Sequence, residues 1–448
     1  MIRWLIELKN KFLSGQSVDA QHSVTYFAHI PKTAGTSFIT VLDRYFDQDS
    51  IYPHQLWRDV EEIPASDHYQ LYRGHLGGGG LKLLTDQPIR YLTIVRDPVD
   101  LTVSTWRFVL REPNTAVHDL VKQREFTLDD FLQHSRTRQL VENRMVRNLS
   151  FDFKEDADAQ EVFLSPTSLK AVQQHVSGQQ ASLNDEHRYQ RARTFLQNCI
   201  WFGLQDQFDA SLQLFSYVFQ QPPIGATQKL NKRRSEQPLS DAQMTAIRKS
   251  NIWDQRFYQD AQSEFDKRYQ AMLEVLQTLR TSDDQSVDDL LDIHYQKHGQ
   301  HALQQAVDFD FGQAMSGTGW HRRELAQPEN NYFRWSGPGK ESFLDFWLQP
   351  DVYDLQLRII NALDSALLDD LIMTANGLSL EWHSHDRGVV RVIQAQIASE
   401  QLSSNGLLRL GFKVKRSVSH AEAFQSNDER QVSFALHWIK ISPCQSQK

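Results

Sequence analysis

Cysteine is scarce in this sequence: its 448 residues include only two, Cys199 and Cys444. They lie far apart, so they form neither a disulfide framework nor the spacing of a metal-ligand cluster. Their scarcity fits a reducing compartment. Long apolar runs are also missing, since no stretch approaches the roughly 18 consecutive apolar residues of a membrane span. The net charge of −8 argues against broad binding to nucleic acid or anionic membranes. We therefore expect a cytoplasmic protein without a membrane span and without a nucleic-acid partner.

The length of the chain predicts more than one domain, because a single hydrophobic core usually stops growing at a smaller size. Residues 1–22 form an N-terminal segment with an amphipathic helical pattern. This helix either packs on the body of the protein or serves as a weak surface or partner anchor. It lacks the continuous apolar centre of a secretion signal.

The first two-thirds of the chain alternates strand-like and helix-like patterns. This alternation predicts an α/β domain over residues 23–282, a three-layer arrangement in which helices cover both faces of a parallel sheet. The predicted strands are short apolar, β-rich runs at residues 24–30, 69–72, 89–95 and 199–204.

After Asp308 the pattern changes to many short strands separated by Gly, Pro, Asn and Asp. We predict a linker or helix at 283–305 and an all-β sandwich domain at 306–448. This accessory domain is expected to regulate or orient the first domain, or to hold a glycan. Its tryptophans form either the sandwich core or a sugar-binding face: Trp320, Trp335, Trp347 and Trp382.

The most informative segment is residues 29–37, between a predicted strand and a predicted helix. A helix N-terminus exposes unpaired N–H groups and the positive end of the helix dipole, so this joint suits a phosphate group. Gly35 allows close approach of the backbone, Thr36 and Ser37 add hydroxyls, and Lys32 adds a positive charge. An ordinary capped turn is the competing interpretation. The turn is P-loop-like but not a Walker A sequence, in which the Lys follows the second Gly. We therefore expect no metal ion.

A second segment, residues 95–104, places Arg96 at a strand end and Ser104 on the following helix. Arg suits bidentate recognition of phosphate. Asp97 and Pro98 between them are typical of a helix start.

Together the two segments resemble those of sulfotransferases that use 3′-phosphoadenosine 5′-phosphosulfate (PAPS), in the branch that contains heparan sulfate 2-O-sulfotransferase. The resemblance covers roughly residues 23–280. It implies that Arg96 and Ser104 bind the 3′-phosphate of the donor. It also implies that the first loop binds the 5′-phosphosulfate, through Lys32, Thr33, Ala34, Gly35, Thr36 and Ser37.

Two later segments support the same resemblance. Residues 201–208 are similar to a strand-to-helix element of the family, and the basic run 229–234 resembles a loop over the nucleotide. Lys232 and Arg233 in that run become donor-binding candidates. A solvated surface loop is the alternative interpretation of the run.

The acceptor side is expected around His75, which follows a predicted strand and precedes the glycine run 77–80. A His is suited to accept a proton near neutral pH, and the segment resembles the one that supplies the base in this branch. The branch has a further His where this sequence has Arg73, which leaves the acceptor sugar open and makes Arg73 a candidate for binding an acidic group. His29 is interpreted as a structural or supporting residue.

Residues 142–149 resemble the acceptor-side segment of the same family, with a solvated helix face as the alternative. The substrate-binding candidates there are Asn143, Arg144 and Arg147. The sequence thus predicts transfer of a sulfuryl group from PAPS to a carbohydrate acceptor, with polysaccharide among the possible acceptors. The chemistry is assigned to His75 as base and Lys32 at the leaving oxygen. A magnesium-dependent small-molecule kinase and a non-catalytic glycan-binding protein are the alternatives.

Overall fold

The computed structural model describes residues 23–60, 68–152, 183–225, 238–299, 301–386 and 388–444. The expected N-terminal helix at 1–22 and the basic run at 229–234 lie outside these residues. The chain divides into two compact units, each built from three stretches of sequence. Unit 1 comprises Met1–Ile39, Ser50–Val218 and Asn231–Val275, and unit 2 comprises Thr40–Asp49, Phe219–Leu230 and Leu276–Lys448.

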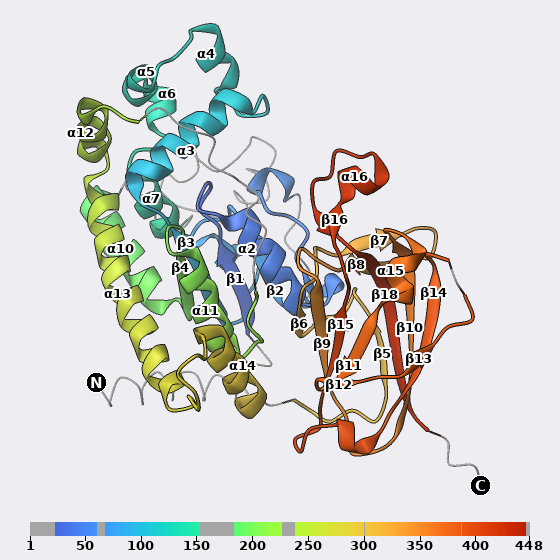
Figure 1. The fold of residues 1–448 in the computed structure, drawn as a ribbon. Coiled ribbons are helices and arrows are strands. Elements are labelled where there is room, and N and C mark those ends of the chain that lie inside the picture. The colour runs from blue at the N-terminus through green and yellow to red at the C-terminus, as the bar shows by residue number, and fades with distance from the viewer. Residues whose placement is uncertain are drawn as a thin grey trace. The chain divides into compact units, whose positions relative to one another are not determined.

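Unit 1 contains a four-stranded sheet in the order β2-β1-β3-β4, in which every pairing is parallel (Figure 1). All side chains of β1 and β4 are buried, as expected for a parallel sheet whose strands are continuous apolar runs. This confirms the predicted α/β class and parallel sheet. The strands are β1 (Val24–Ala28), β2 (Leu71–Gly74), β3 (Ile89–Val95) and β4 (Trp201–Leu204).

Successive residues of a strand point to opposite faces of the sheet, and the ring contacts of β4 show which helices lie on each face. The Trp201 ring stacks on Phe38 of α2 (Gly35–Leu42) at 4.5 Å and meets Phe215 of α11 (Phe208–Phe219) at 5.5 Å. The next residue, Phe202, instead contacts Phe265 of α13 (Ile252–Gln277) at 6.3 Å. Helices therefore pack on both faces of the sheet.

Local capping signals begin several of the helices. Asp97 accepts hydrogen bonds from the N–H groups of Val99 and Asp100, with Pro98 in the first turn, and Ser240 forms a capping box with Gln243. No helix in the described ranges combines the length and apolar character of a membrane span. The other helices of this unit are α3 (Pro98–Arg111), α4 (His118–Gln123), α5 (Leu128–Gln133), α6 (Ser135–Arg138), α7 (Arg144–Ser150), α10 (Asp185–Asn198) and α12 (Asp241–Ser250), with 3₁₀ turns Trp57–Asp59 and Gly80–Leu83.

The N-termini of α7 and α13 cap each other. The fully buried Asp254 carboxylate of α13 accepts the N–H groups of Met145 and Val146, each at 2.9 Å. In return the side-chain oxygen of Asn143 accepts the N–H of Trp253 at 3.2 Å. Burial raises the pKa of Asp254 to about 7, against the lowering effect of the two N–H bonds. The exchange satisfies backbone donors that a helix start leaves unpaired.

Unit 2 is dominated by two antiparallel sheets (Figure 1). One has the order β13-β14-β10-β18-β8-β7, with β5 also paired to β18, and the other has the order β12-β11-β15-β9-β6. The strands are β5 (Val307–Asp310), β6 (Gly317–Thr318), β7 (Glu324–Ala326), β8 (Asn331–Trp335), β9 (Glu341–Trp347), β10 (Tyr353–Ala362), β11 (Ile372–Ala375), β12 (Leu378–Ser379), β13 (Trp382–His383), β14 (Arg391–Ile397), β15 (Leu407–Lys413) and β18 (Phe434–Pro443), beside a separate pair β16 (Val418–Ser419) and β17 (Gln431–Val432).

The two sheets share one core. Leu357 of β10 and Ile439 of β18 belong to the same buried cluster as Leu344 of β9 and Leu410 of β15. Along β10, buried and exposed residues alternate at its start, as expected for strands with one face in a core. Helices also occur among these strands, contrary to the expected helix-free pattern: α15 (Ser365–Asp369) and α16 (His420–Phe424).

Hydrogen bonds of two arginines tie residues 40–49 to the rest of unit 2. Arg323 donates to the carbonyl of Phe46 at 2.8 Å and to that of Asp43. The buried Arg44 donates from its guanidinium to the carbonyl of Trp320 at 3.0 Å. These bonds satisfy carbonyls that a loop would otherwise bury without partners.

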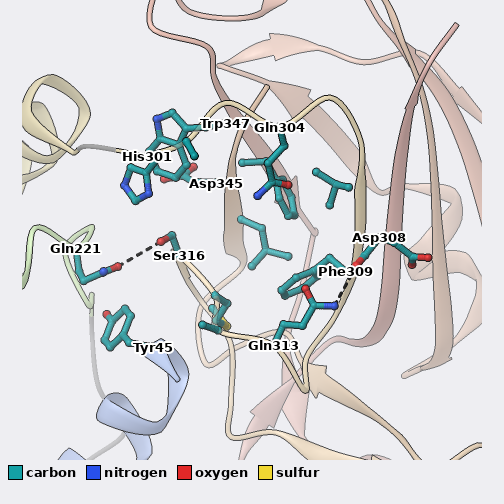
Figure 2. Close-up of a pocket in the computed structure, with 16 residues that line it drawn as sticks. Tyr45, Gln221, His301, Gln304, Asp308, Phe309, Gln313, Ser316, Asp345 and Trp347 are labelled. Carbon is teal, nitrogen blue, oxygen red and sulfur yellow. Dashed lines mark hydrogen bonds between the residues drawn. The ribbon is translucent and has the colours of Figure 1, made fainter. Parts of the chain in front are cut away.

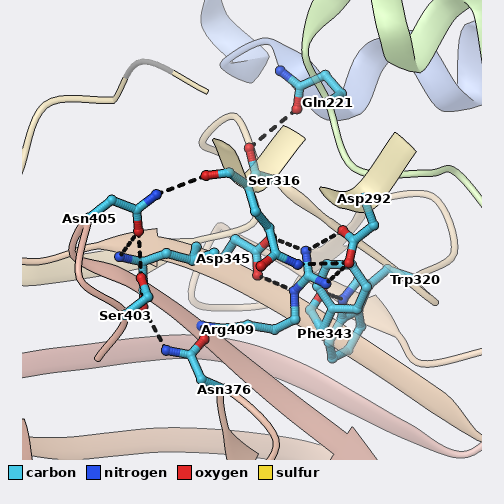
Figure 3. Close-up of polar contacts among 12 residues, drawn as sticks. Gln221, Asp292, Ser316, Trp320, Phe343, Asp345, Asn376, Ser403, Asn405 and Arg409 are labelled. Carbon is cyan, nitrogen blue, oxygen red and sulfur yellow. Dashed lines mark hydrogen bonds and ion pairs between the residues drawn. The ribbon is translucent and has the colours of Figure 1, made fainter. Parts of the chain in front are cut away.

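A single arginine also ties α14 (Val287–His298) to the sheet that contains β9 and β15 (Figure 3). Arg409 of β15 pairs with Asp292 of α14 at 2.6 and 2.8 Å and with Asp345 of β9 at 2.8 and 2.9 Å. Its guanidinium lies 3.9 Å from the centre of the Phe343 ring. Burial lowers the pKa of Arg409, but its bonds to the two carboxylates outweigh burial and raise it.

We expect Arg409→Ala to destabilise the protein by about 3–5 kcal/mol, because it leaves the fully buried Asp345 carboxylate without its counter-charge. The matched control is Arg358→Ala, which removes another arginine–carboxylate pair, in which Nη1 lies 2.8 and 2.9 Å from the two oxygens of the more exposed Glu329. That change should cost at most about 1 kcal/mol. Calorimetric melting of the full chain measures the stability of both variants. Equal losses would contradict a stabilising role for the pairing of Arg409 with Asp292 and Asp345.

Candidate functional site

The segment that joins β1 to α2 has an unusual backbone. Lys32 and Ala34 have φ of 73° and 65°, in the left-handed region that non-glycine residues seldom adopt. The Thr33 hydroxyl donates to the carbonyl of Ile30 at 2.8 Å, inside the turn. Such conformations persist only where the surroundings hold them, so the contacts of this loop are decisive.

Gly35 is required by its contact with His29. A Cβ at position 35 would lie 2.0 Å from atoms of the His29 imidazole, which excludes any larger residue. That imidazole is buried, and burial lowers its pKa well below the ordinary value, aided by the charges of His75, Arg144 and Lys32. Its Nδ1 has no hydrogen-bond partner among the described residues. His29 therefore supports the loop, in agreement with its interpretation as a structural residue.

The two segments singled out in the sequence meet in space. Arg96, which follows β3, donates from Nη1 to the carbonyl of Lys32 at 2.9 Å. Its Nη2 lies 3.8 Å from a carboxylate oxygen of Asp100. The arginine expected to bind phosphate is thus also the one that holds the left-handed turn.

One face of α3 lies along this loop. Positions 100, 104, 108 and 111 follow one another at helical spacing, so they share a face. The ammonium group of Lys32 lies 4.2 Å from the centre of the Phe108 ring, and Asp100 contacts Arg96. Ser104, which is half-buried, is between these two contact points on the same stripe. The helical register thus places Ser104 toward the loop.

Positive charge accumulates around Lys32. Burial lowers the pKa of Lys32, and the charges of Arg111, Arg96 and Arg144 lower it further. Burial also lowers the pKa of Arg144 to about 10, with a contribution from Arg147 and an opposing one from Asp254. Cations that lower one another's pKa values are a feature of functional sites and favour an anionic ligand. Arg111 is not among the candidate residues chosen from the sequence. The only sequence feature that links it to the site is its spacing of seven residues from Ser104.

His75 lies against the same loop. Its Nδ1 is 2.7 Å from the carbonyl oxygen of His29, and the two imidazole centres are 4.3 Å apart. A carbonyl only accepts, so Nδ1 carries the proton and Nε2 keeps its lone pair. Burial lowers the pKa of His75 to about 4; the His29 carbonyl raises it and Arg144 lowers it. The ring is therefore neutral at pH 7 and able to take a proton at Nε2.

The glycine run after His75 is packed closely against residues 149–152. A Cβ on Gly77, whose φ is +79°, would lie 2.3 Å from the Phe151 ring, and one on Gly78 would lie 2.1 Å from the Leu149 carbonyl. Gly79 donates its N–H to the carbonyl of Phe151 at 2.6 Å. The glycines allow the end of α7 to pack against this turn.

The remaining candidate residues differ in their exposure and in their hydrogen-bond partners. Thr36 is exposed and Ser37 half-buried in the first turn of α2. Arg73 donates to the carbonyl of Tyr52 at 3.3 Å, and Arg147 to that of Gln139 at 2.9 Å. Asn143 is buried and caps α13, so its side-chain oxygen is engaged in the fold. Lys232 and Arg233 lie outside the described residues. Within the described ranges, no group of three or more His, Cys, Asp or Glu residues is arranged to hold a metal ion.

No protein-family model and no curated protein matches the sequence. Among solved structures, the chain is similar to a family GH115 4-O-methyl-α-glucuronidase, BtGH115A, with specificity for decorated arabinogalactans. The match has 8% sequence identity and a TM-score of 0.19, and covers 77% of this chain and 41% of the glucuronidase. The chain thus spans less than half of that protein. A likeness at this TM-score carries no argument about fold or function.

We expect the His75 imidazole to stay neutral with its proton on Nδ1 until the pH falls to about 4, because burial lowers its pKa. Nitrogen chemical shifts of labelled histidine distinguish the tautomers and follow the titration, and His75→Gln identifies the signal. A mid-point near the ordinary value of about 6.5, or a proton on Nε2, would contradict this geometry.

Proposed function

We propose that this protein is a sulfotransferase that moves a sulfuryl group from PAPS to a hydroxyl of a carbohydrate. The observation that carries the proposal is the contact between residues 29–37 and residues 95–104. Arg96 binds the Lys32 carbonyl, and the face of α3 that includes Ser104 lies along the same loop. The resemblance assigns these residues to the two ends of one bisphosphorylated donor. Such a ligand has negative charge on both the 3′ and the 5′ side of its ribose, which matches a site supplied with cations from the loop, the end of β3, α3 and α7.

The proposed donor site uses the loop and its neighbours. Thr36, Ser37 and the first N–H groups of α2 hold the 5′-phosphosulfate, since a helix N-terminus favours an anion. Arg96 and Ser104 hold the 3′-phosphate, and Arg111 adds positive charge. In this proposal Thr33, Ala34 and Gly35 shape the turn; the bond of the Thr33 hydroxyl to Ile30 supports that role.

Transfer follows as an in-line displacement, with positioning and electrostatics as the main sources of rate. The acceptor oxygen attacks sulfur while the bond between sulfur and the bridging phosphate oxygen breaks. Nε2 of His75 takes the acceptor proton, and Lys32 stabilises the charge on the departing phosphate. The negative charge of bound donor raises the pKa of His75 from its value in the free protein, which makes the ring a better base.

The first expected result concerns donor affinity. 3′-Phosphoadenosine 5′-phosphate should bind about ten- to a hundredfold more tightly than adenosine 5′-phosphate, the effect of a charge-assisted contact worth roughly 1.5–3 kcal/mol. Calorimetry on the full chain, in excess chelator, measures both nucleotides.

Arg96→Lys keeps the charge but loses the planar fork, so it should reduce that preference. Arg138→Ala, which removes a surface pair with Glu142 at 2.9 Å, is the control and should leave it unchanged. Equal affinities for the two nucleotides in the wild type would refute the donor site. Binding of ATP that depends on magnesium would instead favour a kinase.

The second expected result concerns the chemical step. His75→Ala should lower kcat by about 10²–10⁴-fold, the usual contribution of general-base catalysis, and leave donor affinity nearly unchanged. Lys32→Ala should weaken donor binding and also slow transfer. Because protonated His75 cannot accept a proton, kcat/KM, which reports the free protein, should fall as the pH drops through the lowered pKa of His75.

His118→Ala is the matched control, because His118 also makes an Nδ1 bond to a backbone carbonyl, that of Val109, at 2.7 Å. Transfer of labelled sulfate to a panel of glycans measures both variants. Near-normal turnover by His75→Ala would place the base elsewhere. Tight binding of donor and glycan with no transfer to any acceptor would favour a non-catalytic glycan-binding protein.

A further inference from the structure

Unit 2 contains a cavity of about 310 Å³ that no step of the proposed reaction uses (Figure 2). This volume is at the lower end of the range for small-molecule sites, roughly 300–1,000 Å³. Its walls come from several stretches of the unit, represented by Tyr45, Gln221, Gln304 and Trp347. The side chains of Gln304 and Gln313 at its edge are exposed, so the cavity is accessible from solvent.

Aromatic rings form part of the wall. Trp347 and His301 stack at 3.4 Å between ring centres, and Tyr45 and Phe309 also line the space. Burial lowers the pKa of His301, so its ring is neutral at pH 7. Flat neutral rings offer an apolar surface with few soft torsions. The C–H faces of a sugar ring pack on such surfaces.

The polar groups of the wall offer both donors and acceptors. Ser316 donates its hydroxyl to the side-chain oxygen of Gln221 at 3.3 Å, so the Gln221 amide presents its N–H groups. Gln313 donates to the carbonyl of Asp308 at 3.0 Å, so its own oxygen remains an acceptor. Hydroxyl groups both donate and accept, and this pairing of fixed amides suits a polyol.

The charge of the wall selects against anions. None of the described residues that line the cavity is Lys or Arg. The Asp345 carboxylate is paired with Arg409 at 2.8 Å, and Asp308 lies 3.4 Å from the ammonium group of Lys440. An anionic ligand would find no cation in the wall itself, in contrast to the basic site of unit 1.

The wall is also held in place before any ligand binds. The backbone around Tyr45 is fixed by the bonds of Arg323 to Phe46 and of Arg44 to Trp320. A preformed site loses less conformational entropy on binding. We propose that this cavity binds an uncharged saccharide of one or two sugar rings, as a free sugar or as the end of a glycan. The proposal is independent of the sulfotransferase assignment.

The test measures binding of glucose, galactose, xylose and maltose to the full chain by saturation-transfer NMR and calorimetry. Glucuronate and glucose 6-sulfate are the charged counterparts. At least one neutral sugar should bind, and its charged counterpart should bind more weakly. Gln221→Ala and Gln313→Ala should each weaken binding about three- to tenfold, the effect of one lost hydrogen bond.

Gln356→Ala is the matched control, because Gln356 is an exposed glutamine of β10 outside the cavity, and it should bind sugar as the wild type does. Failure of every neutral sugar to bind would overturn the proposal. So would a preference for the charged sugars, or binding that neither cavity variant weakens. Arg96→Ala separates the two proposals, since it should lose nucleotide affinity and keep sugar binding.

Discussion

The hydrogen bond from Arg96 to the Lys32 carbonyl is the interaction on which the candidate site depends. β1 and β3 are neighbours in the sheet, so the loop after one strand meets the arginine after the other. Left-handed backbone at a non-glycine residue costs of order 1–3 kcal/mol, and this loop has two such residues. The arginine and the contact of His29 with Gly35 offset that cost. The Arg96 guanidinium that shapes the turn therefore also brings positive charge to it.

In the free protein, the positive charges around this loop repel one another. Burial and neighbouring cations lower the pKa values of Lys32, His29 and His75 together. An anion at the loop would relieve the repulsion and move all of these pKa values upward. A site built in this way is preorganised for negative charge, and little reorganisation is needed when the charge arrives.

Local patterns in the sequence were sufficient for much of the fold. The strand predicted at 89–95 is β3, and the helix start expected at Asp97 has the predicted cap. These features depend on neighbours within a few residues. The contact of Arg96 with the Lys32 carbonyl is different, because it follows from the parallel pairing of β1 with β3 rather than from any local pattern.

What the sequence did not reveal depends on partners far along the chain. The glycines after His75 pack against Phe151, and Asn143 caps a helix that begins more than a hundred residues later. Nothing near either position distinguishes packing from substrate binding. The cavity of unit 2 was equally hidden, because its wall joins Tyr45 to residues near position 300.

The division of unit 2 among three stretches of chain determines which fragments of the protein contain the whole unit. A fragment beginning at Leu276 would contain both antiparallel sheets but neither 40–49 nor 219–230. Arg323 would then lose the carbonyls of Asp43 and Phe46 that it binds, and the saccharide cavity would lose Tyr45 and Gln221. A single cleavage of the chain therefore does not release unit 2 with all its residues, and a single fusion of one continuous segment does not add them all to another protein. Unit 2 as a whole includes residues 40–49 from the N-terminal part of the chain.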